Sequence, residues 1–157
     1  MNAKEKALQE ARIKHDCPKG LVPFTMKQPL IRGYAKGWWI LEEDYHFKRK
    51  VRYKKKNYFI DIVVPKGTKW DGCSAPRWSK NFINGSNGPE KILGGMIHDY
   101  LYQMGDYPKR VADYVFYILL KEHYVKNYIA RSMQAAVIVA GSGPWDGHRQ
   151  RQREAGY

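Results

Sequence analysis

Three side chains, His98, Asp113 and Tyr102, have the types and the spacing of a proton-transfer site. His98 and Tyr102 are four residues apart, which places them on one face of a helix. Asp113 lies among tyrosines and leucines, where a carboxylate should be buried and therefore paired. A carboxylate that holds one ring nitrogen of a histidine leaves the other free to act as a general base. The alternative is a buried histidine–aspartate bond with a structural role only.

Two helices joined by a short turn would bring His98 and Asp113 together. The first helix is expected over residues 89–104, because apolar residues recur there at helical spacing after a proline. The second is expected over residues 108–124. The break at 105–107 makes the pair an antiparallel hairpin, in which both side chains lie about 11 Å from the turn. The two side chains can therefore face each other.

Two further carboxylates, Asp71 and Asp99, would offer hard oxygen ligands to a cation. Asp99 follows His98 directly, and Asp71 lies in the loop before the helices. Two carboxylates with loop carbonyls and waters suit Ca²⁺ or Mg²⁺. Each residue also has a simpler interpretation, since Asp-Gly is a turn signal and a charge opposite the apolar stripe of a helix is often only solvated.

A basic stretch is predicted to form a hairpin, with strands at 50–53 and 58–64 around a polar turn at 54–57. Tyr53 and Tyr58 are adjacent for stacking. The stretch could bind nucleic acid or anionic lipid headgroups, or it could be a solvated hairpin tip. Its candidate cations are Lys48, Arg49, Lys50, Arg52, Lys54, Lys55 and Lys56.

The order of these elements predicts an α+β fold. We expect a single domain over residues 1–145, which begins with an arm over residues 1–36 whose chain at 17–37 is extended or irregular. Small antiparallel hairpins follow, with an aromatic strand signal at 38–47, and then three helices, the last at 128–140. The remaining residues, 146–157, are basic and polar and are expected to form a flexible tail.

Composition excludes several classes of protein. The chain has 157 residues, with 28 Lys and Arg against 15 Asp and Glu, a net charge of +13 that attracts nucleic acid, anionic lipid or acidic proteins. Its apolar runs fall far short of the roughly 20 residues that span a bilayer. The first residues lack the apolar segment of a signal peptide, and two cysteines cannot staple a small secreted domain. We therefore expect a protein made in the cytoplasm.

Four motifs occur in an order that resembles an uncharacterised family of phage and prophage proteins. They are VPKG at 64–67, DGCSAP at 71–76, HDYLY at 98–102 and RVAD at 110–113. The resemblance covers about residues 58–145 and brings no established activity. It implies a phage or prophage origin, synthesis in the host cytoplasm and incorporation in the virion as one destination.

The same loop and helices are similar, more distantly, to bacterial-type secreted phospholipases A2. That resemblance implies that His98 is the general base that activates water, that Asp113 orients it and that Tyr102 hydrogen-bonds Asp113. It also implies a Ca²⁺ site that polarises the ester carbonyl. The implied ligands are Asp71, Asp99 and a loop carbonyl near Gly72. Phospholipases of this kind cross-link the loop to the helix with disulfides, whereas here Gly94, Gly95 and Met96 stand just before His98 and offer Cys73 no cysteine partner there.

Three functions follow as hypotheses. The first is a phage-associated, metal-dependent hydrolase with a phospholipase-A2-like His–Asp/Ca²⁺ site that acts on an ester substrate at an anionic lipid surface. The second is a non-enzymatic phage protein, either a virion or tail component that contacts other virion proteins or a host-directed factor, with the His–Asp–Tyr cluster as structural core. The third is a nucleic-acid-binding module that uses the basic hairpin.

Overall fold

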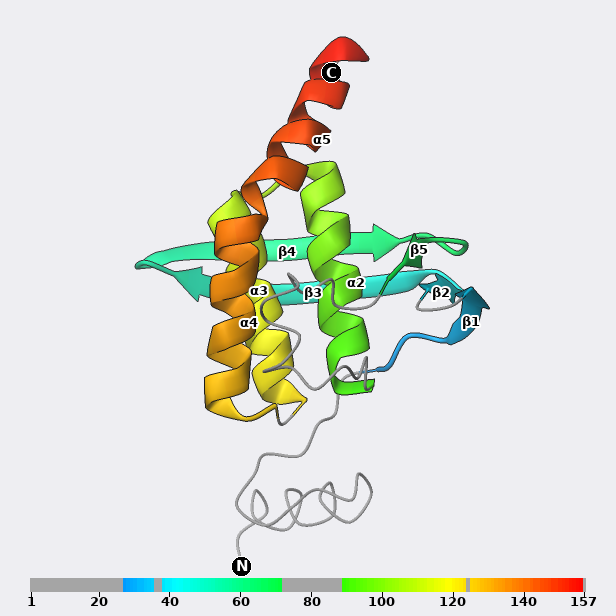
Figure 1. Ribbon diagram of the computed structural model, residues 1–157, viewed down its shortest axis with the longest axis horizontal. Coiled ribbons are helices and arrows are strands. Elements are labelled where there is room, and N and C mark those ends of the chain that lie inside the picture. The colour runs from blue at the N-terminus through cyan, green and yellow to red at the C-terminus, as the bar shows by residue number, and fades with distance from the viewer. Residues whose placement is uncertain (1–26, 36–37, 72–88, 124, 157) are drawn as a thin grey trace, which may run out of the picture.

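The computed structural model describes residues 27–35, 38–71, 89–123 and 125–156 (Figure 1). It has antiparallel strands followed by helices, so the predicted α+β class is confirmed. Gly72 and Cys73 lie outside the described residues. The elements are β1 (Ile31–Ala35), β2 (Trp38–Leu41), β3 (Tyr45–Tyr53), β4 (Lys56–Val64), β5 (Lys69–Trp70), α2 (Pro89–Met104), α3 (Lys109–Glu122), α4 (Asn127–Ala140) and α5 (Ser142–Glu154).

The strands form two separate antiparallel sheets, one of β1, β2 and β5 and one of β3 and β4. The aromatic segment at 38–47, expected as one strand, therefore divides between the two sheets. Strand β1 lies within the arm over residues 1–36, in the segment 17–37 that the sequence predicts to be extended or irregular. Four of its five residues are exposed, so no alternation of apolar and polar residues marks it in the sequence.

The β3–β4 hairpin supplies one wall of the core. Its register runs without a shift from Tyr45 opposite Val64 to Tyr53 opposite Lys56. Only Lys54 and Lys55 form the turn, which is shorter than the turn at 54–57 that the sequence suggests. The residues that the hairpin buries alternate along its strands and pack with α2 and α3: Tyr45, Phe47, Val51, Ile60, Ile62 and Val64.

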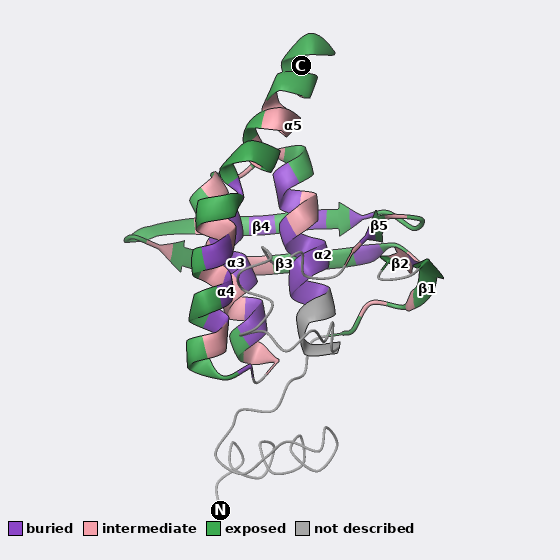
Figure 2. Ribbon diagram, in the orientation of Figure 1, coloured by how far each residue is buried: buried purple, intermediate pink, exposed green. Residues whose placement is uncertain are grey.

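Helices α2 and α3 are antiparallel neighbours; α2 has the expected bounds, and α3, expected over residues 108–124, begins directly after Pro108 and ends at Glu122. Every described residue of α2 from Leu93 to His98 is buried. The helix therefore has no solvated side there, in contrast to the apolar stripe and polar face that its sequence suggests. Figure 2 shows this burial along the middle of the helical layer. Helix α4 packs against α3 around a smaller cluster that contains Phe116, Leu120 and Met133.

Helix α5 replaces the flexible tail that we expected, and the count of three helices is therefore wrong. Its polar residues dock on the carboxyl end of α2. Arg149 Nη2 donates to the carbonyl oxygens of Tyr102 at 2.6 Å and Gln103 at 2.8 Å, and Gln152 Nε2 donates to Gln103 O at 2.9 Å. These donors satisfy carbonyls that a helix end leaves without partners. None of the helices in the described ranges is long and apolar enough to cross a membrane.

Candidate functional site

The structure brings His98, Tyr102 and Asp113 into one cluster between α2 and α3. His98 Nε2 lies 2.9 Å from Asp113 Oδ1, and the Tyr102 hydroxyl donates to the same oxygen at 2.6 Å. Both members of the His–Asp pair are buried, with Asp113 at 0% exposure. Because an ionised carboxylate only accepts hydrogen bonds, Nε2 is the ring nitrogen that carries the proton. The predicted contact between the two helices is present.

A fourth residue, Lys109, completes the cluster and was missed by the sequence analysis. Its ammonium donates to Asp113 Oδ2 at 2.9 Å and to the carbonyl oxygen of Ile138 on α4 at 3.2 Å. Lys109 stands four residues before Asp113, a spacing at which helical side chains meet, so the signal was present in the sequence. Asp113 thus accepts hydrogen bonds from three donors on two helices.

These contacts fix the charge on the cluster. Burial alone would raise the pKa of Asp113, but the hydrogen bonds from His98, Tyr102 and Lys109 outweigh it and hold the pKa below its ordinary value. Burial and the neighbouring Asp113 raise the pKa of the Tyr102 phenol. Asp113 is therefore an anion and Tyr102 a neutral donor at physiological pH.

The second nitrogen of His98 lies on the side of Asp99. Nδ1 is 3.7 Å from Asp99 Oδ1, which is an ion-pair distance and longer than a direct hydrogen bond. Burial disfavours the imidazolium, but the hydrogen bond to Asp113 and the Asp99 carboxylate outweigh it and raise the pKa of His98. The ring therefore has one nitrogen held by Asp113 and one nitrogen available for proton exchange.

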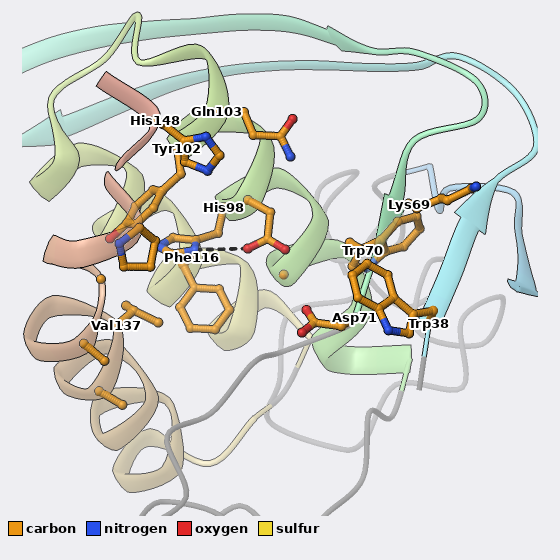
Figure 3. A pocket seen from close by; sticks show the side chains of 16 residues that line it. Trp38, Lys69, Trp70, Asp71, His98, Tyr102, Gln103, Phe116, Val137 and His148 are labelled. Atoms are coloured by element: carbon orange, nitrogen blue, oxygen red, sulfur yellow. Dashed lines mark ion pairs between the residues drawn. The ribbon is translucent and has the colours of Figure 1, made fainter. Parts of the chain in front are cut away.

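A cavity of about 520 Å³ is lined by both His98 and Asp99. Figure 3 shows His98, Tyr102 and Phe116 on one side of it and Trp38, Trp70 and Asp71 on the other. Helices α4 and α5 contribute its remaining walls: Ala136, Val137, Ala140, Pro144 and His148. Most of this lining is apolar, and the charged groups lie on both sides, with His98 and Asp99 on one side and Asp71 on the other, so the cavity can hold an apolar group beside a proton acceptor.

Glycines permit two close approaches around the cluster. Glycine in the middle of a helix lowers its stability, so the Gly94–Gly95 pair of α2 indicates that another group approaches the helix closely there. A Cβ added at Gly94 would lie 3.3 Å from the Phe116 ring, so this approach is made by α3. A Cβ at Gly141 would lie 2.3 Å from the Tyr102 hydroxyl oxygen. Helix packing therefore accounts for both of these positions.

The two carboxylates proposed as metal ligands, Asp71 and Asp99, line the same cavity. Burial is the main cause that raises the pKa of Asp99, and the negative charge of Asp71 adds to it. Within the described ranges, no three His, Cys, Asp or Glu side chains are grouped as a metal centre. Two hard oxygen donors still fit Ca²⁺ or Mg²⁺ where carbonyl oxygens or waters complete the shell, and the expected carbonyl at Gly72 lies outside the described residues.

The basic hairpin is separate from the cavity, because none of its cations is among the residues that line it. Lys48, Lys50 and Arg52 are exposed on one face of β3. Arg49 differs, because its side chain turns to the other face and donates to Glu122 Oε2 of α3 at 2.6 Å. Arg49 is therefore half-buried in an ion pair with α3, unlike the exposed cations of β3.

Fold and site together define an α+β protein that buries a His–Asp–Tyr–Lys cluster beside an apolar cavity. The model of a family described as "Protein of unknown function (DUF1353)" matches residues 41–137, more than half of the chain, and the chain belongs to this family. No curated protein and no solved structure matches the chain. The matched span contains the cluster, both cavity carboxylates and the basic hairpin, and it ends before α5.

Proposed function

We propose that this protein is a hydrolase in which His98 acts as a general base on a water molecule in the cavity. The observation that carries the proposal is the arrangement of the ring: Nε2 is held by buried Asp113, and Nδ1 lies 3.7 Å from a carboxylate oxygen of Asp99, which lines the cavity together with His98. A histidine with one nitrogen fixed by a carboxylate is oriented for proton transfer through the other.

The reaction that suits this geometry is hydrolysis of an ester. In its neutral form, His98 takes a proton from water at Nδ1 while the water oxygen bonds to the ester carbonyl carbon. The tetrahedral intermediate then releases the alcohol, whose oxygen receives the proton from the imidazolium. Asp113 stabilises the imidazolium between the two steps, and Tyr102 and Lys109 keep Asp113 ionised and in place.

The lining of the cavity supports a substrate with an apolar portion. The side chains of Trp38, Phe116 and Val137 face the space beside His98 (Figure 3). An acyl chain would bury apolar surface against them, and each buried methylene contributes about 0.8 kcal/mol. The net charge of +13 would favour an anionic lipid as the source of that chain.

A divalent cation fits the proposal as a cofactor. Asp71 and Asp99, with a carbonyl near Gly72, would hold Ca²⁺, and Mg²⁺ has the same ligand preference for oxygen. The bound cation would supply polarisation of the ester carbonyl. The association with phage and incorporation in a virion rest on the sequence resemblance and stay predictions.

The proposal is tested by comparing two identical substitutions. His98→Asn should lower fatty-acid release from anionic phospholipid vesicles by about 10²–10⁴-fold, because it removes the general base. His46→Asn is the matched control, since His46 lies exposed on the hairpin with its Nε2 on Asp61. The control should keep full activity. Intact vesicles with the native protein, or full activity of His98→Asn, would assign the cluster a structural role.

The metal is tested by thermal unfolding. Ca²⁺ should stabilise the native protein, by roughly 2.7 kcal/mol at a hundredfold excess over Kd. Asp71→Asn with Asp99→Asn should abolish this gain, whereas Asp44→Asn with Asp106→Asn, away from the cavity lining, should leave it unchanged. Equal Ca²⁺ responses in the two double variants would exclude the proposed ligands.

A further inference from the structure

The outer face of the β3–β4 hairpin carries a row of cations that the proposed hydrolase does not use. Lys48, Lys50 and Arg52 alternate with inward-facing residues along β3 and are exposed. Residues two apart on a strand are separated by about 6.6–6.8 Å. This repeat is close to the spacing of phosphates along an extended single strand of nucleic acid, so successive cations can meet successive phosphates.

An exposed aromatic ring lies within this row. Phe59 of β4 is directly opposite Lys50 in the register, and 71% of its surface is exposed. The Lys50 ammonium lies 5.7 Å from the centre of the ring. An exposed ring beside cations is the combination with which proteins stack bases and hold the adjoining backbone.

The positive charge increases toward the tip of the hairpin. At its base, Asp61 pairs with His46 at 2.9 Å and lies 3.9 Å from Lys48. In the described part of the chain, no carboxylate lies within ion-pair distance of Lys50 or Arg52. The tip half of the outer face is therefore the part with charge available to a polyanion.

The turn of the hairpin has a backbone conformation that is unfavourable for lysine, and it carries two more cations. Lys54 and Lys55 both have positive φ, 46° and 67°, as both central residues of a type I′ turn must. Asn-Gly is the preferred pair for such turns, because L side chains rarely adopt this conformation. Lysines at both positions cost stability and place two ammonium groups at the tip.

The position of this surface argues for a polymer rather than a membrane. The inner face of the hairpin packs with α2 and α3 (Figure 1), so the outer face points away from the helical layer. The cavity lies among α2, β5, α4 and α5. None of the cations of the outer face lines the cavity, so a bilayer held by these cations would not thereby deliver a lipid to the cavity, whereas a nucleic acid needs only the hairpin.

We propose that the outer face and tip of the hairpin bind single-stranded nucleic acid, independently of the reaction in the cavity. Phosphates lie on Lys50, Arg52 and the turn lysines, and one base stacks on Phe59. The contacts are to backbone and to a ring face, so binding has little sequence preference.

The test measures binding of a labelled oligothymidylate to the full chain by fluorescence anisotropy over a range of salt concentrations. Lys50→Gln with Arg52→Gln should weaken binding about tenfold or more and reduce the slope of log K against log salt by about 1.4, for two phosphates. The matched control is Lys121→Gln with Lys126→Gln, which removes two exposed charges from the helical side. The control should keep most of the affinity and the slope. Equal losses in the two double variants would overturn the proposal.

Two further binding measurements identify the kind of partner. Phe59→Ser should lower oligonucleotide affinity at least fivefold, since stacking contributes about this much per base. The same oligonucleotide in a duplex, and vesicles of anionic phospholipid, should bind more weakly than the single strand. Tighter binding of either through Lys50 and Arg52 would replace the single strand with that partner and overturn the proposal.

The turn offers a test in which stability and binding change in opposite directions. Lys54→Asn with Lys55→Gly should raise the melting temperature, because both residues suit positive φ, and should weaken oligonucleotide binding severalfold. A turn with a structural role alone would gain stability and keep its affinity. Unchanged affinity would therefore remove the tip from the proposed surface.

Discussion

The cavity cluster and the outer face of the hairpin differ in whether their charged side chains are buried and paired. In the cluster, the buried carboxylate of Asp113 accepts hydrogen bonds from three donors, one of them a lysine. On the hairpin, Lys50 and Arg52 stand on the same face without a carboxylate partner among the described residues. Removing a charge from water is costly unless it is paired, whereas a solvated charge costs little and stays available. Substitutions should therefore change stability in the first region and binding in the second.

The largest effect is expected at the centre of the cluster. Asp113→Ala should lower the free energy of unfolding by about 3–5 kcal/mol, because it leaves the Lys109 charge and two further donors without their buried acceptor. Urea unfolding followed by circular dichroism measures the change. Asp106→Ala, at an exposed carboxylate in the turn between α2 and α3, is the matched control and should cost little. If Asp113→Ala lowered the free energy of unfolding as little as Asp106→Ala, the contrast between the buried cluster and the exposed charges would be wrong.

Acid should weaken the cluster to a smaller extent. The pKa of Asp113 in the folded protein is below its ordinary value of 3.8, so the ionised group stabilises the fold. This contribution is present above the unfolded pKa and is lost as the pH falls through the folded pKa. Asp113→Asn cannot titrate and should be less stable than the native protein at neutral pH. The difference between the two, measured by urea unfolding at several pH values, should shrink in acid; a constant difference would contradict this assignment.

The smallest effect on stability is expected on the hairpin. Lys50→Gln should change the free energy of unfolding by less than about 0.5 kcal/mol, because the side chain is exposed and makes no ion pair with any described carboxylate. Any change should be toward higher stability, since the substitution reduces repulsion with Arg52. A loss of more than about 1 kcal/mol in urea unfolding would show that the outer face is part of the folded framework.

The cluster could be predicted from the sequence because local signals place it. Apolar spacing and the break after Met104 define two antiparallel helices, and equal distances from the turn bring His98 and Asp113 together. The hairpin between β3 and β4 follows from similarly local alternation. In both regions, the partners are close in sequence and the register follows from the turn.

The features that were missed depend on contacts distant in sequence. Helix α5 shows no apolar periodicity, because polar groups such as Arg149 and Gln152 dock it on α2. Arg49 stands in a run of cations and is distinguished only by Glu122, which lies 73 residues away. Polar contacts of this kind leave no pattern in either segment alone, so they appear only when the chain is folded.

Because α5 docks on α2, this helix forms part of the cavity wall and holds the residues of α2 beside it. Arg149 holds the carbonyl of Tyr102, whose hydroxyl is bonded to Asp113, and His148 is part of the cavity wall. A protease that trims the chain after Gly141 would release these carbonyls and open that wall, although it would cut outside the matched family segment. The protein could thus be inactivated by trimming its carboxyl end while every residue that performs the proposed chemistry remained in the chain.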